Sequence, residues 1–321
     1  MQTDERFMRR CLQLAELGLG QTSPNPLVGA VIVRNGVIIG EGYHHKCGEA
    51  HAEINAINSV KDKELLKDST LYVNLEPCSH FGKTPPCADA IIRYEIPKVV
   101  IGTVDFNAKV NGSGIQKLRS AGIEVVTDVC KKESEEINRR FFTFHREKRP
   151  YIILKWAQTA DGFMDIDRKL DPQKSNWISN KALKVLVHKW RSEEDAILVG
   201  YNTMKNDHPQ LTTREYPGKD PRRFVMQRDV EIISEKNYNI LPDQVEEAVK
   251  SLYELGVQSV IVEGGNKTLS KFINADLWDE ARVLVGDICW GRGLKAPQIP
   301  DIPNKVEVID NNRLVYVRRH V

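Results

Sequence analysis

The chain has 321 residues, of which 41% are hydrophobic and 28% are charged, enough for two ordinary domains with separate cores. Its 46 basic and 44 acidic residues leave a net charge of +2, which argues against a polycationic nucleic-acid-binding protein. No segment approaches the roughly 18 consecutive apolar residues of a membrane-spanning helix, and the charged, amphipathic start MQTDERFMRRCLQLAELG is unlike a signal peptide. We therefore expect a cytoplasmic protein with no membrane and no nucleic-acid partner.

Helical and strand patterns alternate in the first half of the chain. Phe7, Cys11 and Leu14 recur at helical spacing and predict an opening helix. Two β-branched runs on either side of Asn35-Gly36 predict a β-hairpin, because Asn-Gly is the strongest short hairpin signal. The following elements are expected to be helices at 51–60, 86–95, 113–122 and 131 to about 144, and strands at 69–76, 98–105 and 123–126. This rhythm predicts an α/β fold with an α/β/α sandwich.

The pattern restarts after a charge cluster and a proline, HREKRP at 145–150, which predicts a domain boundary there. We place one domain at 1–146 and a second at 147–321. The second is again α/β and ends in a probable hairpin at 306–319. Its expected strands are 151–157, 196–200, 222–226, 259–265 and 280–286, and its expected helices 180–190 and 242–256.

Four residues of the first domain have the types and spacing of a catalytic metal site. His51 and Glu53 point about 160° apart around a helix, so they share a site only at its N-terminal end. Cys87 follows two prolines, which favour a helix start, and the helix dipole there lowers a thiol pKa. Cys78 lies at the other end of the loop SHFGKTPP.

One histidine and two cysteines leave a tetrahedral zinc ion with an open position, which is typical of a catalytic rather than a structural site. Two alternatives stay open at this point. The cysteines are an unrelated buried pair, or a structural zinc is completed by His44, His45 or His80.

His51-Ala52-Glu53 with Pro77-Cys78 resembles the zinc-dependent cytidine deaminase superfamily, in which a non-ligand glutamate moves protons while a zinc-activated water attacks an amino-bearing ring carbon. The long loop between the cysteines, together with TSPNPLVGAVIV upstream, resembles the bifunctional deaminase/reductase family of riboflavin biosynthesis. The resemblance implies that Zn²⁺ is held by His51, Cys78 and Cys87 and that Glu53 is catalytic. It also implies substrate contacts at Asn25, His44, His80, Lys83, Asp105 and Asn107, although Phe106 and Ala108 stand where the family usually has prolines.

The second domain contains SVIVEGGNKTLSKFI, a strand, a Gly-Gly turn and a helix whose N-terminus suits an anion. Together with LKWAQTADGFMD and SNWISN, it resembles the dihydrofolate-reductase-like domain of the same family. The resemblance implies an NADPH site formed by Ala157, Trp177, Ser179, Thr203, Asp207, Gly264, Gly265, Asn266 and Lys267. It implies a substrate site formed by Ser175, Arg191, Leu211, Arg214 and Glu263.

Gln227 and Arg228 depart from the family pattern, where an Asp and a small residue commonly follow this strand. The departure falls at the adenosine end of the cofactor site, where Arg228 would face the 2′-phosphate of NADPH. The sequence identifies no general acid for the reduction.

The resemblance implies hydrolytic deamination of 2,5-diamino-6-(5-phosphoribosylamino)pyrimidin-4(3H)-one at C2, followed by NADPH reduction of the ribosyl group to ribityl phosphate. We also expect a homo-oligomer. Three alternatives remain: a deaminase with a decayed second domain, a deaminase of a free base or tRNA, and a zinc-stabilised binding protein without catalysis.

Overall fold

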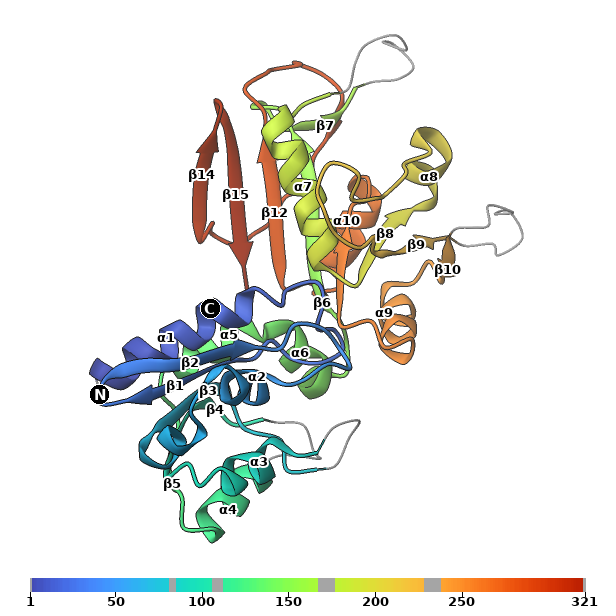
Figure 1. Cartoon of the computed structure of the whole chain (residues 1–321). Coiled ribbons are helices and arrows are strands. Elements are labelled where there is room, and N and C mark those ends of the chain that lie inside the picture. The colour runs from blue at the N-terminus through green and yellow to red at the C-terminus, as the bar shows by residue number, and fades with distance from the viewer. Residues whose placement is uncertain (1, 81–84, 106–111, 167–176, 228–237, 320–321) are drawn as a thin grey trace. The chain divides into compact units, whose positions relative to one another are not determined.

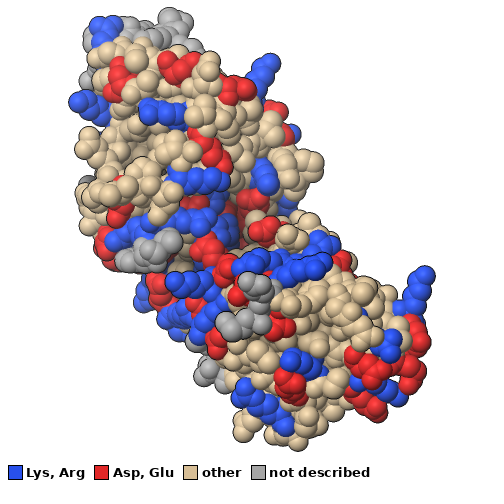
Figure 2. Space-filling model, turned by 90° about the vertical axis from the view of Figure 1, so that its left-hand side faces the viewer, with Lys and Arg blue, Asp and Glu red and all other residues tan. Residues whose placement is uncertain are grey.

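A computed structural model of the chain describes residues 2–80, 85–105, 112–166, 177–227 and 238–319. The chain divides into two compact units, Met1–Glu147 and Lys148–Val321, and the division lies within the charge cluster at 145–150. Within the described residues, none of the helices has the length and apolar character needed to cross a bilayer. On the face seen in Figure 2, basic side chains lie intermixed with acidic ones, in line with the balanced composition.

The first unit is built on a five-stranded sheet (Figure 1). The predicted hairpin pairs its first two strands, and its turn residues Asn35 and Gly36 both have positive φ, as a tight hairpin turn requires. The third strand is antiparallel to the first, and the last two continue the sheet in parallel. In sheet order the strands are β2 (Val37–Tyr43), β1 (Gly29–Arg34), β3 (Thr70–Leu75), β4 (Lys98–Thr103) and β5 (Glu124–Val126).

Both faces of this sheet are covered because its strands alternate apolar side chains between two cores. Ala30 and Ile32 of β1 face α2, α3 and α4, whereas Val31 and Val33 face α1. The helices are α1 (Gln2–Glu16), α2 (Ala52–Ser59), α3 (Cys87–Arg93), α4 (Ser113–Ser120), α5 (Lys131–Ile137) and α6 (Arg139–Glu147), with a short 3-10 helix, η1 (Lys63–Asp68). The result is the predicted α/β/α sandwich.

The charged segment from Lys131 onward forms two helices rather than the one expected. The interruption is at Asn138, whose side chain accepts a hydrogen bond from the backbone N–H of Leu27 and donates one to its carbonyl oxygen. Asn74 of β3 also donates to that carbonyl oxygen. These buried amides hold the segment that leads from Asn25 into β1.

The second unit contains an eight-stranded sheet and a small two-stranded one. Five central strands are parallel, the edge strand β10 pairs in parallel with β9, and the closing hairpin is antiparallel. In order the strands are β10 (Asn239–Leu241), β9 (Arg222–Met226), β8 (Ala196–Gly200), β11 (Ser259–Val262), β6 (Tyr151–Gln158), β12 (Glu280–Val285), β15 (Asn312–Arg318) and β14 (Lys305–Ile309). The small sheet pairs β13 (Leu294–Lys295) with β7 (Phe163–Asp165).

Helices cover both faces of the large sheet. On one face, Val249 of α9 and Phe272 of α10 pack against apolar side chains of β6, β8 and β11, among them Leu154. Trp190 of α7 packs on the other face with Ile153. The helices are α7 (Lys181–Glu193), α8 (Tyr201–Asp207), α9 (Val245–Glu254) and α10 (Asn266–Asn274). Parallel strands buried on both faces bring their carboxyl ends to one edge, where α/β sheets bind ligands.

Candidate active sites

In the first unit, His51, Cys78 and Cys87 form a cluster whose ligand atoms all lie within 4.8 Å of one another. His51 directly precedes α2, Cys78 follows the end of β3, and Cys87 is the first residue of α3 after Pro86. The Nδ1 atom of His51 lies 3.6 Å from Sγ of Cys78 and 3.3 Å from Sγ of Cys87. Three separate element ends therefore supply the nitrogen and two sulfurs that zinc prefers.

The electrostatics of the cluster favour an anionic sulfur next to a protonated ring. The hydrogen bond from the Cys87 thiol, helped by His51, lowers the pKa of Cys78 to about 4, and the backbone N–H of Cys87 also donates to this sulfur. The Cys78 sulfur in turn raises the pKa of His51 to about 9. The pKa of Cys87 is raised by Cys78 and by burial, so this thiol keeps its proton until a cation binds and displaces it. The donor set thus fits a dication that replaces the protons of the cluster.

Glu53 lies in the first turn of α2, is only 3% exposed and is not a member of the ligand cluster. Burial raises the pKa of its carboxyl to about 7, although the charge of His51 opposes this shift. A carboxyl with a pKa near neutrality both accepts and returns protons efficiently. Its position and chemistry suit a general acid and base.

His44 and Asn25 form a hydrogen-bonded pair beside the cluster. The ring of His44 is edge-on to that of His51 with centroids 5.3 Å apart, and its Nε2 lies 3.0 Å from Nδ2 of Asn25. Nδ1 of His44 lies 3.1 Å from the carbonyl oxygen of Ala50, so both ring nitrogens have partners other than a metal. His45 packs on Tyr43 instead.

The remaining residues predicted for the first site lie at different depths. Asp105 is buried, and its backbone N–H donates to the carboxylate of Glu76. His80 is exposed at the end of the segment that follows Cys78. Lys83 and Asn107 lie outside the described residues.

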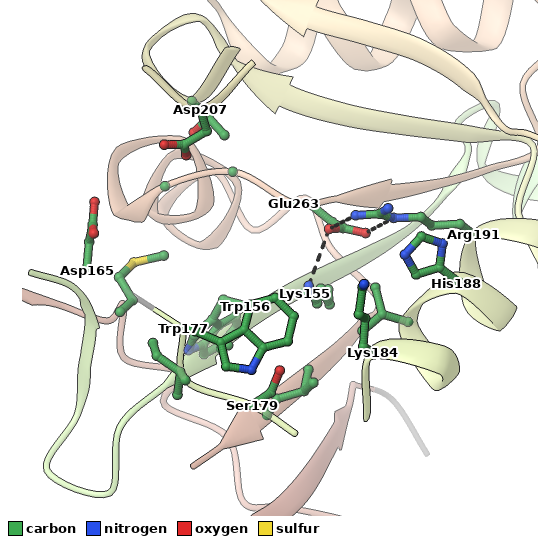
Figure 3. A pocket seen from close by; sticks show the side chains of 18 of the residues that line it. Lys155, Trp156, Asp165, Trp177, Ser179, Lys184, His188, Arg191, Asp207 and Glu263 are labelled. Atoms are coloured by element: carbon green, nitrogen blue, oxygen red, sulfur yellow. Dashed lines mark hydrogen bonds and ion pairs between the residues drawn. The ribbon is translucent and has the colours of Figure 1, made fainter. Parts of the chain in front are cut away.

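The second unit has a pocket of about 360 Å³ at the carboxyl ends of its central strands. Figure 3 shows its walls: Lys184, His188 and Arg191 of α7 lie on one side of the view, and Asp165 and Asp207 on the other. Of the residues predicted from the resemblance, Ala157, Trp177, Ser179, Thr203, Asp207, Arg191, Arg214, Glu263, Gly264 and Gly265 line this pocket.

A triad of charged, mostly buried side chains, each 9–15% exposed, lies in the pocket, as the dashed lines in Figure 3 show. Glu263 accepts hydrogen bonds from Nε and Nη2 of Arg191 at 2.9 and 2.8 Å and from Nζ of Lys155 at 3.3 Å. Burial alone would raise the pKa of Glu263, but the charges of Lys155 and Arg191 outweigh it and lower the pKa to about 2. The carboxylate is therefore held ionised between two cations.

A glycine turn and the N-terminus of α10 form the side of the pocket next to β11. A Cβ atom on Gly264 would lie 2.6 Å from Cβ of Thr268, whereas one on Gly265 would meet nothing closer than the Thr203 hydroxyl at 3.7 Å. Gly264 is thus required for packing, and Gly265 leaves room for a ligand beside the N-terminal end of α10, whose partial positive charge suits an anion. Asn266 donates to the carbonyl oxygen of Lys295, and Lys267 is exposed.

Of the described residues predicted for the substrate site, Leu211 does not line this pocket. It is buried with Met204 and Val225 in the core under α8. Ser175 lies outside the described residues, as does Arg228.

Comparison with known proteins relates both units to one family. Residues 1–103 match the cytidine and deoxycytidylate deaminase zinc-binding region, and residues 150–314 match the RibD C-terminal domain. A riboflavin biosynthesis protein RibD from Aquifex aeolicus is 39% identical over 91% of this chain and 89% of its own length. The chain belongs to the RibD family.

Solved structures of RibD proteins agree over the whole length. A diaminohydroxyphosphoribosylaminopyrimidine deaminase/5-amino-6-(5-phosphoribosylamino)uracil reductase from Thermotoga maritima has a TM-score of 0.86 and 37% identity, with 99% of both chains covered. RibD from Acinetobacter baumannii has a TM-score of 0.88 and 28% identity, again over 99% of both chains. These matches confirm the predicted fold class and a bifunctional chain with a deaminase and a reductase domain, whose cofactors are zinc and NADPH.

Sequence reasoning missed several residues that line the pocket of the second unit, and three of them carried a readable signal. Lys155 is a lone charge inside the apolar strand YIILKWA, which is unusual for a strand buried on both faces. Lys184 and His188 precede Arg191 by seven and three residues, so all three share one face of α7. The other missed lining residues are Trp156, Met164, Asp165, Ile178, Val187, Leu284 and Leu294.

Proposed function

We propose that the first unit deaminates the diaminopyrimidinone ribosyl phosphate and that the second reduces the ribosyl group of the product with NADPH. The observation that carries the first step is the His51, Cys78 and Cys87 cluster with the buried Glu53 beside it. The pocket with a cationic wall and a helix N-terminus supports the second. The Thermotoga maritima relative is named for the same pair of activities.

In the deaminase step, His51, Cys78 and Cys87 would hold the zinc ion, which supplies the Lewis acidity that makes a water nucleophilic at neutral pH. Glu53 then transfers the protons. Its carboxylate accepts a proton from the attacking water and delivers it to the ring nitrogen. It then takes the second proton from the hydroxyl group newly bonded to C2 and passes it to the departing amine, so that ammonia leaves and a carbonyl group forms at C2. The burial that raises its pKa to about 7 suits both directions of transfer.

The pair of Asn25 and His44 is suited to orient the pyrimidine. The carbonyl oxygen of Ala50 only accepts hydrogen bonds, so Nδ1 of His44 carries the proton and Nε2 accepts from the amide of Asn25. This fixes the Asn25 amide so that its Oδ1 is oriented to accept from an amino or ring N–H group of the substrate.

In the reductase step, NADPH supplies the hydride, and the chain supplies binding and orientation. The cofactor would be held by the turn at Gly264 and Gly265, with Asn266 and Lys267 at the helix start. The other residues assigned to it are Ala157, Trp177, Ser179, Thr203 and Asp207. The fork of Arg191 is occupied by Glu263, so we assign the substrate phosphate to the wall that Arg191 shares with Arg214, Lys184 and His188.

A paired assay tests both steps. Zinc-loaded protein is given the diaminopyrimidinone ribosyl phosphate, and ammonia release and NADPH oxidation are followed in the same cuvette. We expect ammonia first and NADPH oxidation second. Glu53→Gln should slow both by roughly 10²- to 10⁴-fold, and Glu124→Gln, a control on an exposed carboxylate, should leave both unchanged. Adding the deaminated intermediate should restore NADPH oxidation to the Glu53→Gln variant. Ammonia without NADPH oxidation would overturn the reductase assignment, and neither signal would overturn both.

We also propose that the chain assembles as a homo-oligomer, which the family resemblance implies, and that it is cytoplasmic. Light scattering of the purified protein measures the oligomeric state, and cell fractionation tests the cytoplasmic location.

A further inference from the structure

Glu76 carries a buried carboxylate that accepts four backbone hydrogen bonds. Its Oε2 accepts from the N–H groups of Asp105 at 3.2 Å and Gly112 at 3.0 Å, and its Oε1 from those of Gly114 at 2.9 Å and Ile115 at 3.2 Å. The residue is 4% exposed and lies between the end of β3 and the metal-cluster residue Cys78. A buried charge is tolerated only where such donors satisfy it.

The four amides come from two places in the fold. Asp105 follows β4, whereas Gly112 is the N-cap residue of α4, and Gly114 and Ile115 belong to its first turn. The N-terminal end of this helix carries a partial positive charge. Glu76 also donates its own N–H to the carbonyl oxygen of Thr103 at the end of β4. One side chain therefore ties the end of β3 to the end of β4 and to the start of α4, which lies next to α3 (Figure 1).

Two further contacts fix the same segment on α4. The hydroxyl oxygens of Ser79 and Ser113 lie 2.6 Å apart. A Cβ atom on Gly114 would lie only 2.0 Å from the carbonyl oxygen of Pro77, so that position has no room for a side chain. Residues on both sides of Cys78 thus rest against the helix start.

Cys78 is held from its other side by α3. Its carbonyl oxygen accepts from the N–H of Ala88 at 3.1 Å, and its sulfur from the N–H of Cys87 at 3.3 Å. The sulfur is therefore placed by two helix starts, α3 through direct hydrogen bonds and α4 through Glu76. A metal centre needs its ligand atoms within about 0.2 Å of their correct distances, which makes this placement a requirement for binding.

We propose that Glu76 is a positioning residue of the metal centre, which sets the affinity for zinc by fixing the segment that carries Cys78 on α4. The inference rests on the proposed zinc ligands. In Glu76→Gln the side chain keeps its size, but an amide NH₂ group faces two of the four N–H donors. The resulting shift of Cys78 should weaken zinc binding by roughly 10- to 100-fold, the usual effect of losing a group that orients a metal ligand.

The test compares zinc affinities of the folded full-length chain by competition with a chromophoric chelator. Glu76→Gln removes the carboxylate, and Gly114→Ala pushes on Pro77 from the α4 side while Glu76 stays in place. Glu124→Gln, at an exposed site on β5, is the matched control and should bind like wild type. Both test variants should lose deamination at limiting zinc and recover it in excess zinc. Reduction of the deaminated intermediate by the second unit should be unchanged throughout.

The outcomes distinguish a failure of the Glu76 proposal from a failure of the proposed zinc site. If wild-type protein binds no zinc, the proposed deaminase site is wrong. If wild type binds zinc and both variants bind it equally well, the role of Glu76 is overturned. Should circular dichroism show that these variants do not fold, Ser79→Ala decides. It removes one hydroxyl contact of the segment and should weaken zinc binding about 3-fold, the size of one modest hydrogen bond, and unchanged affinity there would also overturn the proposal.

Discussion

The two sites of this RibD chain are built in opposite ways. The metal cluster takes a few atoms from three element ends in the first unit, and its ligand atoms lie within 4.8 Å of one another. The pocket of the second unit is lined by twenty of the described residues, which come from several strands and helices. A site that depends on a few atoms fails when one is changed, whereas a broad pocket loses function in steps. The predictions below use this difference.

The largest expected effect comes from metal removal. Dialysis against a strong chelator should abolish ammonia release because the three ligands alone supply no nucleophile. Oxidation of NADPH with the deaminated intermediate should continue, since the pocket of the second unit contains none of these residues. Added zinc should restore ammonia release. A parallel loss of both activities would show that the two sites are not independent.

Next in size is Glu53→Gln, which removes the proton carrier and leaves the ligands. We expect deamination to slow by roughly 10²- to 10⁴-fold, the usual contribution of general acid and base catalysis. Zinc content, measured by atomic emission, should stay at the wild-type level because Glu53 is not a ligand. Cys78→Ala should instead lose the zinc. Zinc loss in Glu53→Gln would mean that the carboxylate binds the ion itself.

Glu263→Gln tests the buried triad of the reductase pocket. Lys155 and Arg191 would face an amide in place of a carboxylate, and breaking a buried ion pair costs about 3–5 kcal/mol. All five tryptophans of the chain lie in the second unit, so tryptophan fluorescence during denaturation reports the free energy of unfolding of that unit. Glu254→Gln, on an exposed pair with Lys250, is the control and should lose almost nothing. An equal loss in both variants would contradict the triad.

The same carboxylate predicts a pH dependence. The pKa of Glu263 is lowered from 4.5 in the unfolded state to about 2 in the folded state. Its ionised carboxylate therefore stabilises the folded state at pH values above 4.5, and this stabilisation is lost as the pH falls through about 2. The shift corresponds to about 3 kcal/mol. The difference in unfolding free energy between wild type and Glu263→Gln should therefore shrink from pH 6 to pH 2. A constant difference would show that the side chain is not ionised between its two partners.

The first site could be predicted from sequence because its information is local. His51 and Cys87 were placed at helix starts from the His-x-Glu pattern and the two prolines, and both lie there. What the sequence could not show is Glu76, because its four hydrogen bonds go to backbone amides that no side-chain pattern marks. The break of the charged helix at Asn138 was missed for a similar reason, since its partner Leu27 is 111 residues away.

The second site was predicted mainly through resemblance. Its members are far apart in the sequence, and only the strand order β8, β11, β6 and β12 brings their carboxyl ends together. Lys155 and His188 were missed because a single polar or charged residue in a strand or helix is usually a surface residue. The side chain of Leu211, which the resemblance placed in the substrate site, packs in the core, so its role there stays a prediction.

The smallest expected effect is at the rim of the pocket. Lys184 lines the pocket and pairs with Glu215, whereas Lys189 on the same helix is exposed and is not part of the lining. If the cationic wall binds the substrate phosphate, Lys184→Ala should raise the KM of the reductase step a few-fold and leave kcat unchanged, since one partly exposed charge contributes about 1 kcal/mol. The effect should fade at high salt, because screening weakens exposed charges. Lys189→Ala should leave KM as it is. An equal change of KM in both variants would show that α7 does not bind the substrate phosphate.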